Sequence, residues 1–333
     1  MVKMRFAEIF GDCYSIKSLK LLKQLGCTDV IGHGPKNSGD VWEYSDLVEL
    51  KKRVEDLGLR LDVLEDGPKI DKIMLGLPGR EQQLENFCKS LQNLGRAGIK
   101  VIKPQHMPPG WDEVMTVFNS PTRGGAESRV FDYELVKDIP PTKYGVVSEE
   151  QAWDNLKYFL EGVLPTAEES GVKVSLHPDD PPISPIRGFA RILRSVDAFD
   201  RMLEIYPSKN IGLLFCQGCF AEMGVNIPAT IRHFGRIDKI FFAHFRDVFG
   251  SVPKFQESFH GEGSTDMFEA MKAYYEVGFD GPIRPDHAPK MEGDELYGEG
   301  KPGYYLLGKV YALGYMRGLA ESVEKTYPSF IRP

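Results

Sequence analysis

The sequence predicts an α/β protein in which eight parallel strands and their helices close into a (β/α)8, or TIM, barrel. Short apolar runs alternate with amphipathic stretches of helical length from one end of the chain to the other. Glycines stand directly before several of the apolar runs, where a helix must end before the next strand begins. Four of the later runs end in a side chain that binds metals well. These observations favour a barrel whose strand ends converge on one site.

Eight apolar runs have the length of buried strands. The expected strands cover residues 4–10, 29–34, 60–66, 100–107, 173–179, 211–218, 240–248 and 281–287. Right-handed connections between parallel strands close eight such units into a barrel. A doubly wound sheet is the alternative, but no Gly-rich phosphate-binding loop follows an early strand.

Amphipathic stretches between the strands carry apolar residues at helical spacing. The clearest of them cover residues 45–57, 80–97, 148–170 and 265–277. The predicted N-caps are Ser45, Ser148 and Thr265. The glycines predicted to end helices in the left-handed conformation are Gly58, Gly98, Gly171 and Gly278.

Residues 1–333 are expected to form one domain, because no linker or low-complexity tract interrupts the alternation. Three segments are longer than a barrel needs: 108–147 after the fourth strand, 249–264 after the seventh and 288–303 after the eighth. Loops that follow the strands lie on the catalytic face of a barrel. We therefore expect these extended loops to act as lids or substrate walls.

Composition excludes several classes of function. The formal net charge of −7 leaves no basic surface for nucleic acid, and no apolar stretch reaches membrane-span length. The first residues, MVKMRFAEIFGDC, lack the apolar core and cleavage site of a secretory signal. We expect a reduced, cytoplasmic homo-oligomer that binds a small molecule and neither nucleic acid nor membrane.

The metal-binding side chains stand where apolar runs meet polar loops. His177, Cys216, His244 and Asp286 end the runs KVSLHPDDPP, IGLLFCQG, IFFAHFRD and GPIRPDH. Parallel strand ends converge in a barrel, and imidazole, thiolate and carboxylate ligands together suit Mn, Fe, Co or Zn. A single histidine or cysteine in an apolar run is more often part of the core, but four at the same structural position predict a metal site.

Cys216 and Cys219 form the only C-x-x-C pair among five cysteines, and no second pair completes a zinc knuckle. A redox role for such a pair requires a helix N-terminus to lower the pKa of a thiol. Cys216 is instead expected to close a strand, so we do not expect this role.

Arg246 follows His244 by two residues, so both side chains are expected on the same face of the strand. An inward guanidinium would bind a substrate carboxylate with two parallel hydrogen bonds. The alternative is an ion pair with Asp247 at the rim of the barrel. Asp179 and Asp180, which follow His177, would either orient a histidine N–H or form the turn.

Asp286 and His287 are adjacent at the end of the last predicted strand, where Pro285 favours a turn. A carboxylate ligand next to a histidine that is not a ligand puts a base beside a Lewis acid. This arrangement suits removal of a proton α to a carboxylate, because the metal would stabilise the developing charge.

The order of motifs resembles that of the mannonate dehydratases, a family of metal-dependent barrel enzymes related in fold to xylose isomerase. The motifs that carry the resemblance are HPDDPP, FCxG, HxRxV, GxGxTDM, IRPDH and PGY, and it extends from about Gly39 to Gly318. The resemblance implies dehydration of D-mannonate to 2-keto-3-deoxy-D-gluconate, a step of hexuronate degradation. It further implies Mn²⁺ or Fe²⁺ held by the four strand-end residues, and catalytic roles for His287 and for Tyr304 of the PGY motif. The pair can serve as base and acid in either order, and we expect His287 to be the base and Tyr304 the acid. Tyr305 is an adjacent competitor.

The chain departs from the family pattern at the first and fourth strands, where it reads FAEIF and QHMPPGW. Glu8, His106 and His260 are therefore expected either to contact the substrate or to fill the barrel mouth. These departures leave two further readings open. One is a sugar isomerase or epimerase of the xylose-isomerase-like group, and the other is a divergent homologue that binds a different sugar acid or has lost turnover.

Overall fold

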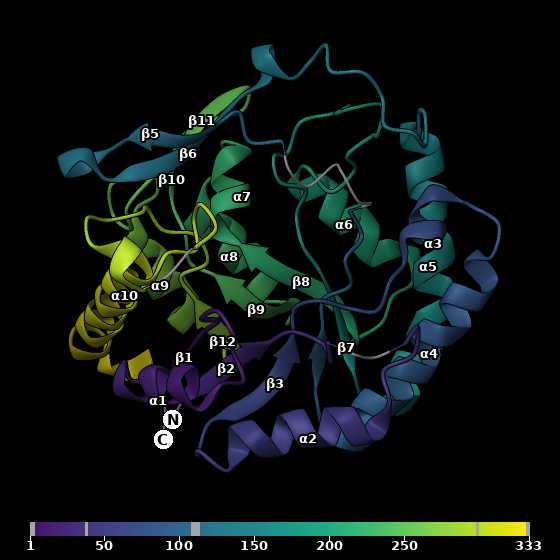
Figure 1. Ribbon diagram of the computed structural model, residues 1–333, viewed down its shortest axis with the longest axis horizontal. Coiled ribbons are helices and arrows are strands. Elements are labelled where there is room, and N and C mark those ends of the chain that lie inside the picture. Colours follow the sequence, from purple (N-terminus) through teal and green to yellow (C-terminus); the bar gives the residue numbers. More distant parts are fainter. Residues whose placement is uncertain (1–3, 37–38, 108–113, 298–299, 331–333) are drawn as a thin grey trace.

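The computed structural model describes residues 4–36, 39–107, 114–297 and 300–330, and its centre is a closed barrel of parallel strands (Figure 1). The strands are hydrogen-bonded in the order β1-β12-β9-β8-β7-β4-β3-β2. They are β1 (Arg5–Glu8), β2 (Asp29–Gly32), β3 (Arg60–Leu64), β4 (Val101–Ile102), β7 (Lys173–Leu176), β8 (Ile211–Cys216), β9 (Ile240–His244) and β12 (Pro282–Arg284). The predicted (β/α)8 class is confirmed. Each strand is shorter than its apolar run, because the chain leaves the ladder before the run ends.

Ten α-helices are assigned in the described part of the chain, and Figure 1 shows most of them around the barrel. They are α1 (Ile16–Gln24), α2 (Tyr44–Glu55), α3 (Asp71–Leu75), α4 (Arg80–Ala97), α5 (Glu149–Ser170), α6 (Val196–Ile205), α7 (Gln217–Glu222), α8 (Ile227–Gly235), α9 (Met267–Glu276) and α10 (Leu306–Thr326). Helix α4 has the predicted bounds. The glycines predicted to end helices, Gly58, Gly98, Gly171 and Gly278, all have positive φ.

Two of the three predicted N-caps are wrong. Helix α2 begins at Tyr44 with Glu43 as its N-cap, so Ser45 lies inside the first turn. Helix α9 has Asp266 as its N-cap, one residue after Thr265, and the Asp266 carboxylate accepts the backbone N–H of Glu269. Both predictions placed the boundary within one or two residues, which is the usual uncertainty of a helix end.

A second sheet is built from two segments that the sequence predicted only as long loops. Its four antiparallel strands, in the order β10-β11-β6-β5, are β10 (Val248–Ser251), β11 (Lys254–Glu257), β6 (Glu127–Asp132) and β5 (Val117–Pro121). Phe131 and Phe255 are opposite each other in the ladder, and the centroids of their packed rings are 5.5 Å apart. In Figure 1 this sheet lies to one side of the barrel, at the upper left. The beginning of segment 108–147 lies outside the described residues.

The core has two parts. A small cluster of apolar side chains, all from barrel strands, comprises Ala7, Ile31, Val63, Val101, Leu214, Phe241 and Phe242. A much larger cluster packs strands against helices and includes Phe159, Phe215 and Phe220. Within the described residues, no helix is long and apolar enough to cross a membrane.

The cap of α5 gives a test of the fold. The Ser148 hydroxyl accepts the Gln151 backbone N–H, and the Gln151 side chain accepts the Ser148 N–H, which completes a capping box. Ser148→Ala should lower the free energy of unfolding by about 1 kcal/mol, measured by urea denaturation. The matched control is Ser45→Ala, because Ser45 is exposed and caps no helix, so its effect should stay below about 0.5 kcal/mol. Equal losses in the two variants would contradict the capping assignment.

Candidate active site

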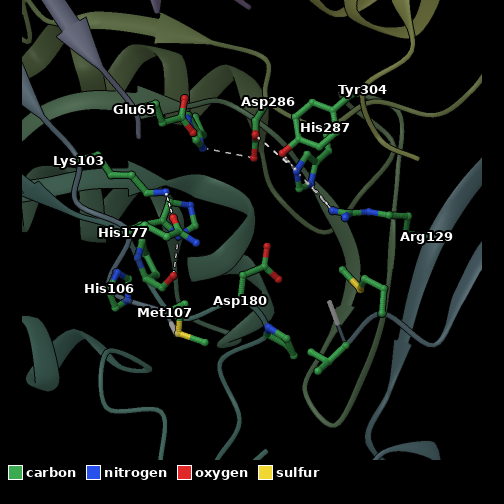
Figure 2. A pocket seen from close by; sticks show the side chains of 16 residues that line it. Glu65, Lys103, His106, Met107, Arg129, His177, Asp180, Asp286, His287 and Tyr304 are labelled. Carbon is green, nitrogen blue, oxygen red and sulfur yellow. Dashed lines mark hydrogen bonds and ion pairs between the residues drawn. The ribbon is translucent and has the colours of Figure 1, made fainter. Parts of the chain in front are cut away.

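A cavity of about 240 Å³ opens at the carboxyl-terminal ends of the barrel strands (Figure 2). Its described lining comes from strand ends, from the loops after them and from β6 of the second sheet. The lining residues are Glu65, Lys103, Gln105, His106, Met107, Val114, Met115, Arg129, His177, Pro178, Asp180, Pro181, His244, Asp286, His287 and Tyr304. Six of the sixteen are arginine, lysine or histidine and three are acidic, so the cavity suits a charged, polar ligand rather than an apolar one.

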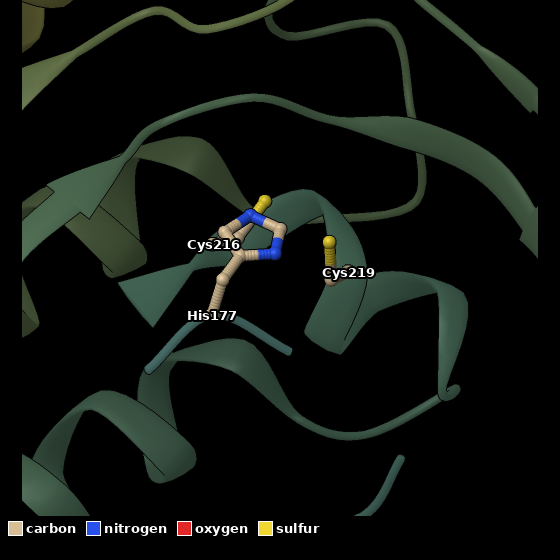
Figure 3. Close-up of side chains that lie close together, drawn as sticks. All are labelled: His177, Cys216 and Cys219. Atoms are coloured by element: carbon tan, nitrogen blue, oxygen red, sulfur yellow. The ribbon is translucent and has the colours of Figure 1, made fainter. Parts of the chain in front are cut away.

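The four predicted metal-binding side chains lie close together, and three of them, His177, His244 and Asp286, line this cavity. Ligand atoms of Cys216, His244 and Asp286 lie within 4.8 Å of one another. Ligand atoms of His177, Cys216 and Cys219 also lie within 4.8 Å of one another. Figure 3 shows these three side chains close together. Cys216 belongs to both groups and therefore links all four predicted residues. Cys219 is an additional thiol that the sequence did not single out as a ligand.

The two imidazoles are oriented by fixed neighbours. The Nδ1 of His177 is 2.6 Å from the carbonyl oxygen of Pro178, so Nδ1–H donates there and Nε2 is free to bind a cation. His244 has Glu65 Oε1 at 3.3 Å from Nε2 and Asp286 Oδ2 at 3.3 Å from Nδ1. This places the Nδ1 of His244 on the side of Asp286, in the group that also contains Cys216.

Asp286 occupies an unusual backbone conformation. Strand β12 ends at Arg284, Pro285 follows, and Asp286 has φ of +65°, a left-handed conformation that a non-glycine residue adopts at a cost of roughly 1–3 kcal/mol. Burial opposes ionisation of its carboxyl, but His244, His287 and Arg284 outweigh burial and hold its pKa well below the ordinary value. Asp286 is therefore an anion in the folded protein.

His287 lies at the centre of a hydrogen-bonded chain. Its Nδ1 is 2.7 Å from Glu257 Oε1, and its Nε2 is 2.6 Å from the Tyr304 hydroxyl. Arg129 approaches the same Nδ1 and also binds Glu257 through two nitrogens, at 2.8 and 2.5 Å. Because an anionic carboxylate only accepts, Nδ1 carries the proton and donates it to Glu257. The lone pair of Nε2 then accepts the Tyr304 O–H.

The ionisation states of these groups agree with that assignment. Burial, reinforced by Arg129, lowers the pKa of His287 below its ordinary value, so the ring is neutral. Burial raises the pKa of Tyr304 well above its ordinary value, so the phenol keeps its proton. Tyr304 is nevertheless 42% exposed as a whole residue, which places its ring at the mouth of the cavity while its hydroxyl faces His287. The pair is a neutral base hydrogen-bonded to a neutral acid.

Arg246 does not have the position that the sequence predicted. Its side chain shares the inward face with His244, but it is buried below the cavity and is not among the described lining residues. Its guanidinium is 2.7 Å from Asp180, 2.9 Å from Glu222 and 3.2 Å from both Glu257 and Asp286. The ion pairs described for Arg246 do not include the predicted alternative partner, Asp247. The guanidinium of Arg246 therefore already contacts acidic side chains of the protein itself.

Glu8 and His260 are likewise buried and are not among the described residues that line the cavity. Glu8 accepts hydrogen bonds from Lys309 at 3.0 Å and Arg284 at 3.2 Å, so it serves as a buried counter-ion. Burial lowers the pKa of His260 to about 4, which keeps this ring neutral. Neither placement supports the predicted contact with substrate. His106 does line the cavity, with Nε2 3.7 Å from Asp179.

The two aspartates after His177 serve different partners. Asp179 accepts the backbone N–H of Leu193 at 2.7 Å and faces His106, so it fixes the loop. Asp180 lines the cavity and accepts a hydrogen bond from Arg246. The partner found for the Nδ1–H of His177 is a backbone carbonyl rather than either carboxylate.

Sequence reasoning missed Arg129 and Glu257. Both lie on the second sheet, on β6 and β11, in segments that appeared as loops. Their sequence neighbourhoods carry no motif, and only the ladder between β6 and β11 brings them together. Glu65 and Lys103 were also missed. Each is the residue directly after a barrel strand, so the strand-end criterion used for the histidines would have found them.

Comparisons with known proteins indicate the family of the chain. A family model described as D-mannonate dehydratase (UxuA) matches residues 2–144 and 141–329. The mannonate dehydratase of Thermotoga maritima is 34% identical over 95% of this chain and 96% of its own length. Mannonate dehydratase 2 of Halalkalibacterium halodurans is also 34% identical, over 86% and 89%.

Solved structures give the same result. The crystal structure of mannonate dehydratase from Streptococcus suis serotype 2 matches with a TM-score of 0.87 and 31% identity, over 98% of this chain and 95% of that one. An L-ribulose 3-epimerase matches with a TM-score of 0.60 at 14% identity, over 98% and 97%, which shows the xylose-isomerase-like fold alone. The resemblance predicted from the motifs is confirmed, and the chain belongs to the mannonate dehydratase family.

Proposed function

We propose that this protein dehydrates D-mannonate to 2-keto-3-deoxy-D-gluconate with the help of Mn²⁺ or Fe²⁺, as a step of hexuronate breakdown in the cytoplasm. Membership of the mannonate dehydratase family supports the reaction. The observation that carries the proposal is the neutral His287–Tyr304 pair, hydrogen-bonded at 2.6 Å and next to the anionic Asp286. A base and an acid at one position are what loss of a C2 proton and a C3 hydroxyl requires.

The donor set fits the proposed metal. His177, Cys216, His244 and Asp286 would supply two imidazole nitrogens, one sulfur and one carboxylate oxygen, a mixture suited to Mn²⁺ and Fe²⁺. The buried Nδ1 of His244 lies 3.3 Å from Asp286 Oδ2 without hydrogen-bond geometry, as expected of two atoms that would share a cation. When bound, such an ion supplies a Lewis acid that polarises the substrate carboxylate and makes the C2 proton more acidic.

The substrate carboxylate needs a cation in the cavity, and the described lining offers Lys103 and Arg129. Arg129 already binds the Glu257 carboxylate through two nitrogens. Lys103 donates to a neutral group, the Gln105 side-chain oxygen, at 2.8 Å. A lysine whose partner is neutral attracts an anionic ligand more strongly than an arginine that is already paired with a carboxylate. We therefore assign carboxylate binding to Lys103. This assignment replaces the one predicted for Arg246.

The protein groups then divide the proton transfers. Glu257 accepts the Nδ1–H of His287, so Nε2 carries the lone pair and His287 is the proposed base for the C2 proton. Tyr304 retains its proton and lies 2.6 Å from that nitrogen, so we assign it as the acid that protonates the departing C3 hydroxyl. An isomerase or epimerase reaction has only fold-level likeness in its favour, and fold does not fix function.

Metal content tests the ligand assignment. Wild-type protein should bind a single divalent ion per chain, whereas His177→Ala and Asp286→Ala should lose it while keeping their far-ultraviolet circular dichroism. His233→Ala is the control, because that histidine is exposed and pairs with Asp200 on the surface. Elemental analysis of the purified variants gives the readout. Full occupancy in both ligand variants would contradict the proposed site.

Exchange of the C2 proton with deuterated solvent separates the base from the acid. His287→Asn should abolish exchange and lower turnover by roughly two to four orders of magnitude. Tyr304→Phe should block dehydration yet preserve exchange, because the base remains. Tyr305→Phe is the matched control, since Tyr305 forms the N-cap of α10 and its ring packs against Lys290. Wild-type exchange in His287→Asn would move the base elsewhere.

Substitution of Lys103 tests carboxylate recognition. Lys103→Gln removes a charged hydrogen bond worth about 1.5–3 kcal/mol, so KM for mannonate should rise by roughly tenfold to a hundredfold, with a smaller change in kcat. Lys100→Gln is the control, because Lys100 stands at the opposite end of the same strand and pairs with Asp62 at 3.2 Å. An unchanged KM in Lys103→Gln would leave Arg129 as the carboxylate-binding residue.

A further inference from the structure

Two buried thiols lie close together beside His177, a residue that lines the cavity. Cys216 is the last residue of β8, and Cys219 lies in α7, which begins at the next residue, Gln217. The two sulfur atoms and a ring nitrogen of His177 are within 4.8 Å of one another (Figure 3). The sequence predicts no redox role for this pair, because Cys216 is expected to close a strand. In the structure Cys216 both ends β8 and is the N-cap residue of α7.

The backbone geometry of this pair fits a disulfide. Residues three apart at the start of a helix have Cα atoms about 5 Å apart. Disulfides in proteins span Cα separations of roughly 4.4–6.8 Å, so side-chain rotation alone would bring the two sulfur atoms into bonding distance.

A common neighbour orients both sulfur atoms. Arg246 Nε is 3.4 Å from Cys216 Sγ, and Arg246 Nη2 is 3.2 Å from Cys219 Sγ. Both thiols are buried and neither is among the described residues that line the cavity, but ligand atoms of His177 and Asp180, which do line it, lie within 4.8 Å of Cys219 Sγ. A small oxidant of the size of hydrogen peroxide would have to pass these two cavity residues to reach the pair.

We propose that Cys216 and Cys219 are a disulfide-forming site, oxidised by a peroxide, and that this modification competes with the metal ion. One thiolate sulfur attacks the O–O bond of hydrogen peroxide, becomes a sulfenic acid and releases hydroxide. The second thiol attacks that sulfur, the S–O bond breaks, and water leaves as the disulfide forms. Two thiols and one peroxide thus give one disulfide and two molecules of water.

The competition follows from the role of Cys216, and this part of the inference rests on the proposed function. A thiolate binds a divalent cation through its negative charge, whereas a disulfide sulfur has lost that charge. The protein would then exist in a reduced form that holds the ion and an oxidised form that does not. Reduction by a dithiol would restore the first form.

The first experiment tests the disulfide alone. The full-length protein, as purified, is treated with hydrogen peroxide, denatured, alkylated and examined by peptide mass mapping. Free thiols should fall from five to three, and the peptide that contains Cys216 and Cys219 should lose two hydrogen atoms, reversibly with dithiothreitol. Cys219→Ser should not show that loss, whereas Cys88→Ser, which changes a thiol in α4, should show it unchanged. A peptide that gains oxygen instead would overturn the disulfide.

The second experiment tests the competition with metal by elemental analysis of the same samples. Oxidised wild type should lose its bound Mn²⁺ and regain it after reduction, and Mn²⁺ added before the peroxide should slow disulfide formation severalfold. If the disulfide forms but the Mn²⁺ content is unchanged, the competition is overturned and Cys216 is not a ligand. If no disulfide forms while Mn²⁺ binding depends on His177 and Asp286, the inference fails and the proposed function stands.

Discussion

The candidate site depends on the position of one carboxylate, that of Asp286, between two buried guanidinium groups. Arg246 Nε is 3.2 Å from one of its oxygens, and Arg284 Nη2 is 3.0 Å from the other. Buried cations are stable only when anions surround them, because desolvation costs several kcal/mol for each ion. Arg284 therefore also binds Glu65, and Arg246 also binds Glu257. These contacts tie β12, β9, the residue after β3 and the second sheet to one point, so loss of either arginine would leave unpaired charges on several elements at once.

The barrel and the second sheet contribute different parts of the chemistry. Barrel strand ends provide the candidate ligands, whereas β6 and β11 provide Arg129 and Glu257, which fix the tautomer of His287. The epimerases of similar fold show that the barrel architecture is compatible with more than one reaction. In this chain the residues that orient the proposed base come from outside the barrel, which explains why the fold class alone would not have indicated a dehydratase.

Sequence patterns predicted the barrel and the convergence of its strand ends, because both follow from local periodicity and from the parallel arrangement. His177, Cys216, His244 and Asp286 were found in this way. The second sheet was not predicted, since β5 is mostly exposed and offers no alternation of apolar and polar residues. Arg246 shows a different limit. The two-residue period gave the direction of its side chain correctly, but the depth at which it lies depends on acidic partners from four other segments.

The backbone at the end of β12 explains how two adjacent residues can both serve the site. Neighbouring side chains on a strand point to opposite faces, so Asp286 and His287 could not both face the cavity if the strand continued. The ladder ends at Arg284, and the left-handed conformation of Asp286 turns the chain so that both side chains line the cavity. The ion pairs of Asp286 with the two arginines hold this strained conformation in place. The charges that stabilise the carboxylate therefore also position the proposed base.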